Sequence, residues 1–208
     1  MAIPATILER AAHLNVSRES WIRLELYVDL LLHWQQHINL ISPATIPDIW
    51  ERHILDSLQA LVHLPQNTTA FADLGSGGGT PGLPLAITSG AHVHLYESNG
   101  KKAAFLRETL RATSTAGTVH NLRLENITTE PLPRVQAVTA RALAPLPLLL
   151  ELAEPFLELG ACGVFHKGQD VDAELTEAAK SWRIQSHSPQ SITDSRAVIL
   201  IIKEAKRV

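Results

Sequence analysis

The sequence has a single cysteine, Cys162, among its 208 residues. One thiol excludes an internal disulfide and a metal cluster held by thiolates. No apolar run reaches the ~18–20 uncharged residues that a membrane-spanning helix needs. The first residues include Glu9, Arg10 and His13 where a signal peptide requires an uninterrupted apolar stretch, so we expect a cytoplasmic protein.

An excess of basic charge is also missing. The chain has 18 Lys and Arg against 21 Asp and Glu, a net charge of −3 at pH 7. This balance is unlike the basic domains that usually bind nucleic acids. Segment 101–111 is a local exception, because Lys101, Lys102, Arg107 and Arg111 stand there against one acidic residue, Glu108. Such a patch can attract a polyanion, although scattered Lys and Arg on a helix also form an ordinary solvated face.

The ten histidines do not form a metal-binding motif. His33 and His37 are one helical turn apart, and His92 and His94 share one face of a predicted strand. No HExxH motif accompanies them, and no cysteines or carboxylates stand at ligand spacing. We expect no metal site.

The chain divides into two regions by its hydrophobic pattern. Residues 1–66 have a helical pattern, with one long helix expected in WIRLELYVDLLLHWQQHI after Ser17 and another in IWERHILDSLQALVHL, ending near Pro65. Residues 67–208 alternate short apolar runs with helical segments, the runs being FADL, HVHLYE, VHNLRLEN, VQAVTARAL, ACGVFHKG, RIQSHS and AVILIIK. This spacing predicts parallel βαβ units closed by an antiparallel edge hairpin. The predicted fold is an α/β, Rossmann-like, mostly parallel sheet with a helical N-terminal cap.

The stretch FADLGSGGGTPGLPLAI, residues 71–87, holds five glycines within eight residues. Glycines between a strand and a helix let the backbone turn sharply and approach a ligand. A Walker P-loop is excluded because no Gly-Lys-Ser/Thr follows, and the dinucleotide fingerprint is incomplete. The loop alone therefore indicates a nucleotide-like ligand or a tight connection without one.

Two carboxylates refine this interpretation. Glu97 ends the second predicted strand 22 residues after Gly75, a position suited to ribose hydroxyls of either NAD or S-adenosylmethionine (SAM). Asp73 lies in the first strand, where its charge would repel a pyrophosphate but suit the sulfonium and amino groups of SAM, directly or through water. The residues thus favour SAM.

A family resemblance follows from five stretches. DLGSGGGTPG is similar to the first motif of SAM-dependent methyltransferases. IWERHILDSL, ESNGKKAAFLRE, TARALAPL and HKGQ resemble the bacterial 16S ribosomal RNA guanine-N7 methyltransferases, the small-subunit methyltransferase G family, also known as glucose-inhibited division protein B. The similarity runs from about Asn39 to Gln169. It implies a class I enzyme, expected to be monomeric, that methylates a guanine of the 530 loop in 16S ribosomal RNA or the small subunit.

The resemblance, together with the chemistry of Asp73 and the local basic charge of segment 101–111, indicates the site residues. Those expected at the cofactor are Asp73, Gly75, Gly77, Thr80, Glu97, Ser98, Asn99, Thr129, Glu130 and Arg141. Arg141 is also expected to face the guanine as the catalytic residue, the alternative being a structural salt bridge. Those expected at the RNA are Arg52, His53, Lys101, Lys102, Arg107 and Lys167.

The implied reaction needs few catalytic groups. Guanine N7 has a lone pair and no proton, so no base is required, and alignment of the reactants can supply ~7–11 kcal/mol. Two other functions stay open on the sequence: a nicotinamide-dependent oxidoreductase, and a non-catalytic nucleotide- or RNA-binding module.

Overall fold

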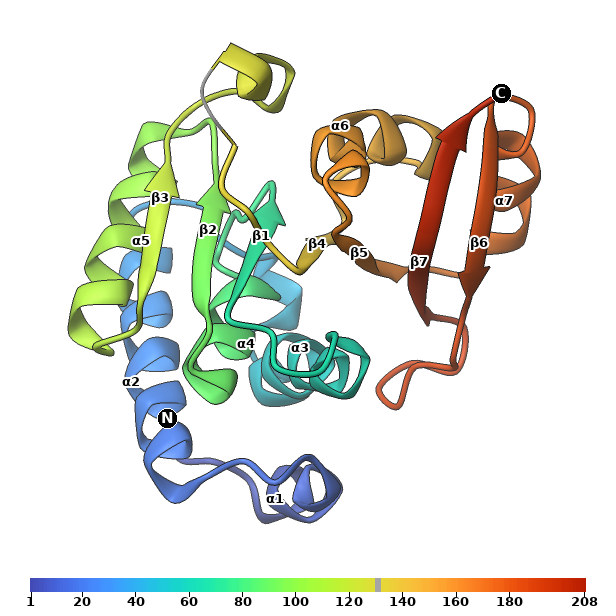
Figure 1. The fold of residues 1–208 in the computed structure, drawn as a ribbon. Coiled ribbons are helices and arrows are strands. Elements are labelled where there is room, and N and C mark those ends of the chain that lie inside the picture. The colour runs from blue at the N-terminus through green and yellow to red at the C-terminus, as the bar shows by residue number, and fades with distance from the viewer. Residues whose placement is uncertain (130–131) are drawn as a thin grey trace.

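The computed structural model describes residues 1–129 and 132–208 and contains a seven-stranded sheet (Figure 1). The strand order is β3-β2-β1-β4-β5-β7-β6. Neighbouring strands are parallel, except that β7 is antiparallel to both β5 and β6. The strands are β1 (Ala70–Leu74), β2 (His92–Tyr96), β3 (Gly117–His120), β4 (Ala137–Arg141), β5 (Cys162–Lys167), β6 (Trp182–His187) and β7 (Val198–Arg207).

Helices cover both faces of this sheet. The N-terminal region contains α1 (Ala5–Arg10), η1 (Ala12–Leu14), α2 (Arg18–Gln35), η2 (Pro43–Thr45), η3 (Trp50–Leu55), α3 (Asp56–Leu58) and η4 (Gln59–His63). The connections between strands contain α4 (Gly82–Ser89), α5 (Gly100–Ala112), η5 (Leu124–Thr129), α6 (Leu146–Glu158) and α7 (Val171–Ala178). Among the described residues, no helix is long and apolar enough to cross a membrane.

Strand β1 shows how the core is divided. Phe71 belongs to a hydrophobic cluster with α2, α4 and α5, whereas Ala72 and Leu74 belong to a second cluster with α6 and α7. Successive side chains of a strand point to opposite faces, so an almost continuous apolar run is buried on both sides. This arrangement places the carboxyl end of β1, and the glycines after it, at the centre of the sheet edge.

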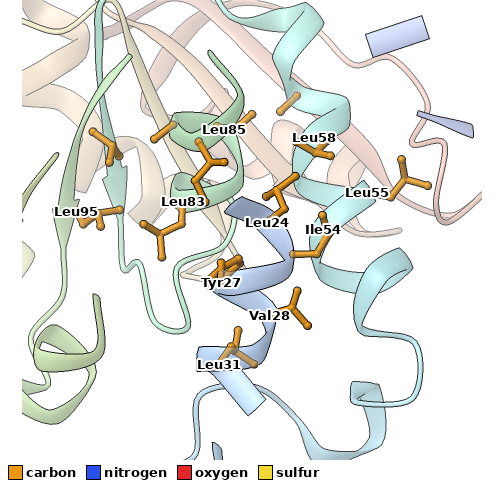
Figure 2. Close-up of a cluster of buried hydrophobic side chains, with 14 of the residues drawn as sticks. Leu24, Tyr27, Val28, Leu31, Ile54, Leu55, Leu58, Leu83, Leu85 and Leu95 are labelled. Atoms are coloured by element: carbon orange, nitrogen blue, oxygen red, sulfur yellow. The ribbon is translucent and has the colours of Figure 1, made fainter. Parts of the chain in front are cut away.

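Helix α2 attaches the N-terminal region to the sheet. Ser17 caps the helix by accepting a hydrogen bond from the N–H of Ser20. Its buried stripe, Leu24, Tyr27, Val28 and Leu31, has helical spacing and packs near Leu83 and Leu95 (Figure 2). The cap and the sheet therefore share one hydrophobic cluster, and the division into 1–66 and 67–208 stays a prediction.

Two expected elements differ from the structure. The helix expected before Pro65 is a succession of a π-helix (η3), α3 and a 3₁₀-helix (η4). Only Gly117–His120 of the expected strand around VHNLRLEN is a strand, and Leu124–Thr129 is a 3₁₀-helix. The side chain of Asn121 donates to the carbonyls of Glu97 and Ser98, at 2.8 and 3.0 Å, and ends the strand there.

The C-terminal hairpin forms as expected, with one refinement. β7 pairs antiparallel with β5, and β6 is the outermost strand. The loop between them, residues 188–197, returns to the N-terminal helices: the side chain of Gln59 accepts from the N–H of Ile192 at 2.9 Å. The hairpin thus helps to enclose one end of the sheet.

Candidate active site

The loop after β1 has a conformation that requires glycine. Gly75 and Gly77 have φ angles of +67° and +54°, in the left-handed region that disfavours side chains. A Cβ on residue 75 would also lie 2.6 Å from Cδ1 of Leu143. The glycines therefore allow both the turn and the close approach of the segment after β4.

Hydrogen bonds to three residues, from the end of β2 and from α2, fix this loop. The N–H of Gly77 donates to Oε2 of Glu97 at 2.8 Å, and the N–H of Ser76 donates to the carbonyl of Tyr96 at 3.0 Å. From the cap, the buried hydroxyl of Tyr27 donates to the carbonyl of Gly78 at 2.6 Å. Both β2 and α2 hold the loop in place.

Glu97 lies where the second strand ends and is only 8% exposed. Its Oε1 accepts from the N–H of Asn99 at 2.7 Å, while its Oε2 accepts from Gly77. An ionised carboxylate offers about four acceptor positions, so two backbone bonds leave room for ribose hydroxyls.

A cavity of about 360 Å³ opens beside these residues. Its polar lining includes Gly75, Gly77, Glu97, Ser98, Lys102, Arg123 and Glu125, and its apolar lining includes Leu122, Leu124, Leu143, Ala144 and Leu148. An apolar wall suits a purine, the carboxylate suits a ribose, and the bare loop suits the methionine part of SAM. The residues present fit this cofactor.

A second cleft also borders the segment that follows β4. It has two parts, of about 230 and 290 Å³, and both are lined by Arg141, His166 and Lys167. Leu143 and Ala144 line the larger part and also the cofactor cavity. Leu143 and Ala144 therefore form a wall that the two spaces share.

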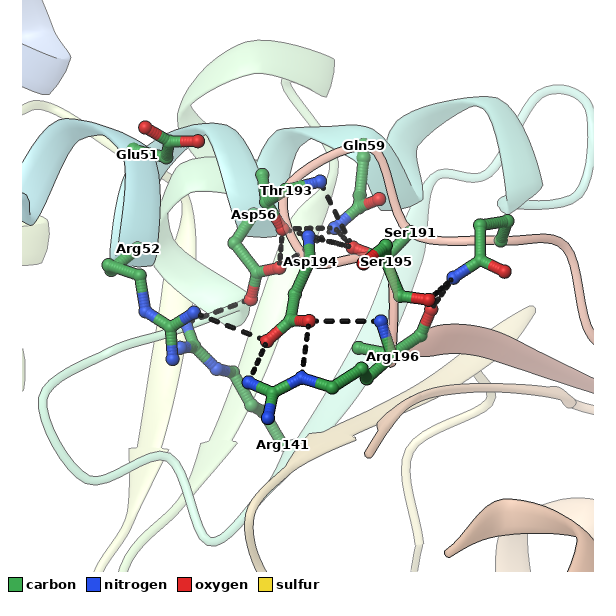
Figure 3. Close-up of polar contacts among 12 residues, drawn as sticks. Glu51, Arg52, Asp56, Gln59, Arg141, Ser191, Thr193, Asp194, Ser195 and Arg196 are labelled. Carbon is green, nitrogen blue, oxygen red and sulfur yellow. Dashed lines mark hydrogen bonds and ion pairs between the residues drawn. The ribbon is translucent and has the colours of Figure 1, made fainter. Parts of the chain in front are cut away.

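An acidic residue of the N-terminal region faces Arg141 across this cleft. Oδ2 of Asp56 lies 3.2 Å from Nη1 of Arg141, and Oδ1 accepts from the hydroxyl of Thr193 at 2.5 Å. Figure 3 shows the two carboxylates, Asp56 and Asp194, among three guanidinium groups, those of Arg52, Arg141 and Arg196. The π-helical turn η3 directly precedes Asp56, and such turns are frequent at functional sites.

The comparisons with known proteins agree with this geometry. The sequence model of the family described as rRNA small subunit methyltransferase G matches residues 21–201. This chain belongs to that family. A ribosomal RNA small subunit methyltransferase G from Rhodospirillum rubrum is 50% identical over 197 residues, covering 95% of this chain and 96% of the relative. One from Nitrobacter hamburgensis is 46% identical, with 98% and 81% covered.

A solved structure shows the same fold at low identity. An O-methyltransferase from Bacillus cereus in complex with SAH has a TM-score of 0.62 and 14% identity, with 96% of this chain and 97% of that chain covered. The predictions of a class I fold, a SAM-dependent methyltransferase and the small-subunit methyltransferase G family are confirmed. The oxidoreductase alternative finds no support in these relatives.

The structure brings some predicted cofactor residues together and separates others. Gly75, Gly77, Glu97 and Ser98 line the cofactor cavity. Thr80 is half-buried and Asn99 is exposed, but neither lines it. Asn99 instead caps α5 by accepting from the N–H groups of Lys101 and Lys102, at 2.9 and 3.2 Å. Thr129 ends η5, with its side chain outside the described part, and Glu130 lies outside the described residues altogether.

Asp73 lies beneath the loop rather than in the cavity. Its side chain is fully buried, and Oδ1 accepts from the hydroxyl of Thr139 on β4 at 2.7 Å. A Cβ on residue 82 would lie 2.8 Å from Oδ2, so Gly82 leaves just enough room for the carboxyl group. Burial raises the pKa of Asp73 to about 7, against hydrogen bonds that lower it. Asp73 thus supports the loop from below.

The predicted RNA residues of the cleft also differ among themselves. Arg52 is exposed at 45% of its side chain, 3.6 Å from Asp194. His53 is buried, lies 2.7 Å from the hydroxyl of Thr45, and has its pKa lowered to about 4 by burial. Burial therefore favours the neutral form of His53 at pH 7, and its contact with RNA stays a prediction. Lys167 is 8% exposed and paired with Glu174 at 2.5 Å.

Helix α5 carries the remaining predicted RNA residues. Lys101, Arg107 and Arg111 are exposed, and Nη2 of Arg107 donates to the carbonyl of Val119 at 3.5 Å. Lys102 is half-buried and lines the cofactor cavity. The two neighbouring lysines therefore have different surroundings.

Sequence reasoning missed the apolar wall and the acidic partner of Arg141. Leu143 stands in the TARAL stretch that carries Arg141, and Asp56 in the HILDSL stretch of the family resemblance. The ion pair between Arg141 and Asp56 depends on a contact between β4 and the N-terminal region, which no local pattern reveals. Within the described residues, no group of three His, Cys, Asp or Glu side chains could hold a metal ion.

Proposed function

We propose that this chain transfers the methyl group of SAM to N7 of a guanine in 16S ribosomal RNA. The observation that carries the proposal is the shared wall: Leu143 and Ala144 line both the cofactor cavity and the cleft of Arg141. A methyl donor held at the glycine loop and a base held beside Arg141 would meet at this wall. The family description supports ribosomal RNA as the substrate, and the lining shared by the two spaces supports transfer beside Leu143 and Ala144.

The residues present suit an alkylation that needs no base. When bound, SAM supplies an electrophilic methyl group. Glu97 accepts hydrogen bonds from the ribose, and the glycine loop approaches the methionine part closely. Arg141 donates to O6 of the guanine, as arginine does when it reads this base edge, while N7 stays free to react. Orientation of the two reactants then accounts for most of the rate.

The RNA extends from the cleft over the neighbouring cations. Arg52, Lys101 and Arg107 are exposed and placed to contact phosphates, which favour guanidinium and ammonium groups. Our proposal includes the finer expectations from sequence: a target guanine in the 530 loop, a small subunit or free 16S RNA as substrate, and a monomer that works in the cytoplasm.

The experiment supplies the purified chain with SAM and either 16S RNA or small subunits from cells that lack the gene. Nucleoside analysis of the product is expected to show one 7-methylguanosine per RNA, mapped to the 530 loop. Glu97→Ala serves as the control with a damaged cofactor site. RNA binding without any methylated product would instead support a non-catalytic RNA-binding module.

A further inference from the structure

Lys167 is held in a network that ends on the wall between the two cavities. Its Nζ lies 2.5 Å from Oε2 of Glu174 on α7 and donates to the carbonyl of Ala144 at 3.1 Å. The same Oε2 of Glu174 accepts from the N–H of Leu146 at 2.6 Å. Lys167 from β5 and Glu174 from α7 thus hold residues 144–146 in place through hydrogen bonds.

The hydrogen bond from Leu146 to Glu174 replaces a missing helix cap. Helix α6 begins at Leu146 directly after Pro145, whose side chain has no hydrogen-bond acceptor. The first N–H groups of a helix need acceptors, and a negative charge is favourable at that end. Glu174 provides both from a different helix, and Lys167 compensates its charge in a site where Lys167 is only 8% exposed.

The segment that Lys167 and Glu174 hold includes Ala144, which lines both cavities. Arg141 lies just before it, and Leu143 packs so closely on the glycine loop that a Cβ at residue 75 would come within 2.6 Å of it. A displacement of this segment would therefore change the cofactor cavity and the Arg141 cleft together. A shift of about 1 Å at such a place can slow a reaction about 100-fold.

We propose that Lys167 and Glu174 are positioning residues that hold the shared wall of Leu143 and Ala144 where methyl donor and guanine meet, rather than Lys167 being a phosphate ligand. The proposal rests on the proposed function and adds a role that sequence reasoning assigned differently. The two roles of Lys167 make opposite predictions for Glu174. If Lys167 bound phosphate, Glu174→Gln would free its charge, tighten RNA binding and steepen the salt dependence. If it positions the wall, Glu174→Gln slows methyl transfer and leaves RNA affinity unchanged.

The test compares Lys167→Met, Glu174→Gln and the double variant with the wild type in single-turnover methyl transfer to small subunits, at saturating SAM. Each single variant is expected to react about 10- to 100-fold more slowly, and the double variant no more slowly than the worse single one. RNA affinity and its salt slope are expected to stay within twofold. Glu177→Gln is the matched control, because Glu177 lies on the same helix as Glu174, forms an exposed pair with Lys180 and should leave the rate unchanged.

A second readout does not depend on activity. Hydrogen exchange at the amide of Leu146 is expected to accelerate at least tenfold in both single variants, with the exchange of β4 unchanged. Unchanged exchange at Leu146, or tighter RNA binding by Glu174→Gln, would overturn the proposal. If the wild type transferred no methyl group, the proposed function would fail while the exchange data still decided the role of the pair. If either variant fails to fold, Lys167→Arg and Glu174→Asp replace it. These substitutions keep the charges but change the side-chain lengths, and the same outcomes decide the proposal.

Discussion

The carboxylate of Glu97 accepts a hydrogen bond from the N–H of Gly77 at 2.8 Å and so joins the ends of β1 and β2. The same group faces the cofactor cavity. Glu97 therefore has two tasks, shaping the glycine loop and binding the ribose, and its removal should affect both.

Glu97→Ala is expected to weaken SAM binding about 10- to 100-fold, because charge-assisted hydrogen bonds contribute about 1.5–3 kcal/mol each. Glu97→Gln should lose less, since its amide oxygen can still accept from the Gly77 N–H. Calorimetric titration with SAM measures both constants. A dissociation constant unchanged in Glu97→Ala would remove this residue from the cofactor site.

Asp73 predicts a specific dependence of stability on pH. Its pKa is raised from the usual 3.8 to about 7 by burial, so between these values the folded state binds more protons than the unfolded state. The contribution of Asp73 to the free energy of unfolding therefore falls as pH rises from about 4 to about 7. Above pH 7 this contribution no longer changes with pH.

Asp73→Asn removes this titration. Relative to the wild type, its free energy of unfolding without SAM should rise across pH 4 to 7, by at most roughly 4 kcal/mol. Comparing the two proteins at each pH cancels the histidines, including His53 and His94, whose lowered pKa values near 4 act in the opposite direction. Denaturant titrations give the values, and the exposed Asp172→Asn is the control. A difference that stays constant over this range would contradict the assignment.

Substitutions of Lys101 and Lys102 should distinguish effects on RNA binding from effects on cofactor binding. Lys101→Ala is expected to weaken RNA binding and reduce the salt slope by about 0.7, the amount for one phosphate on a single strand, with SAM affinity unchanged. Lys102→Ala should also weaken SAM binding, because Lys102 lines the cofactor cavity. Titrations of RNA at several salt concentrations and of SAM distinguish the two. If Lys101→Ala changed neither RNA affinity nor slope, this face of α5 would be an ordinary solvated surface.

Much of the fold was predictable because its signals are local. The apolar run of β1, the glycines after it and the spacing to Glu97 identify one strand-loop-helix unit that binds an adenosine-containing ligand, either NAD or SAM. The strand predicted through Leu122 and Leu124 was wrong beyond His120, since Asn121 satisfies carbonyls of the neighbouring loop instead of continuing the ladder. Local propensity does not contain that long-range hydrogen bond.

For the candidate site, the sequence predicted where the functional residues stand in the fold better than it predicted what surrounds their side chains. The positions of Glu97 and Arg141 were inferred correctly as lying at the carboxyl ends of β2 and β4. The burial of His53 and the pairing of Lys167 were not, because each depends on a partner that stands elsewhere in the fold. A cation in the sequence indicates charge, while its availability to RNA depends on tertiary contacts.

Arg141 should affect turnover rather than cofactor binding. Arg141→Ala is expected to slow methyl transfer about 100-fold at saturating SAM and RNA, with SAM affinity within threefold of the wild type. Arg141→Lys should recover little, since an ammonium group cannot reproduce the planar guanidinium, which can pair with Asp56 and donate to O6 at the same time. Single-turnover kinetics with parallel SAM titrations measure this. A variant that lost only thermal stability would show that the ion pair with Asp56 is structural.

The central claim is that methyl transfer goes to guanine N7 where the cofactor cavity and the Arg141 cleft meet, beside Leu143 and Ala144. The most direct measurement uses small subunits reconstituted with 16S RNA transcribed from either GTP or 7-deaza-GTP, which places carbon where N7 would be. With the wild-type chain and labelled SAM, we expect about one methyl group on the ordinary RNA and none on the deaza RNA. Equal labelling of both RNAs, or labelling of neither, would contradict the account.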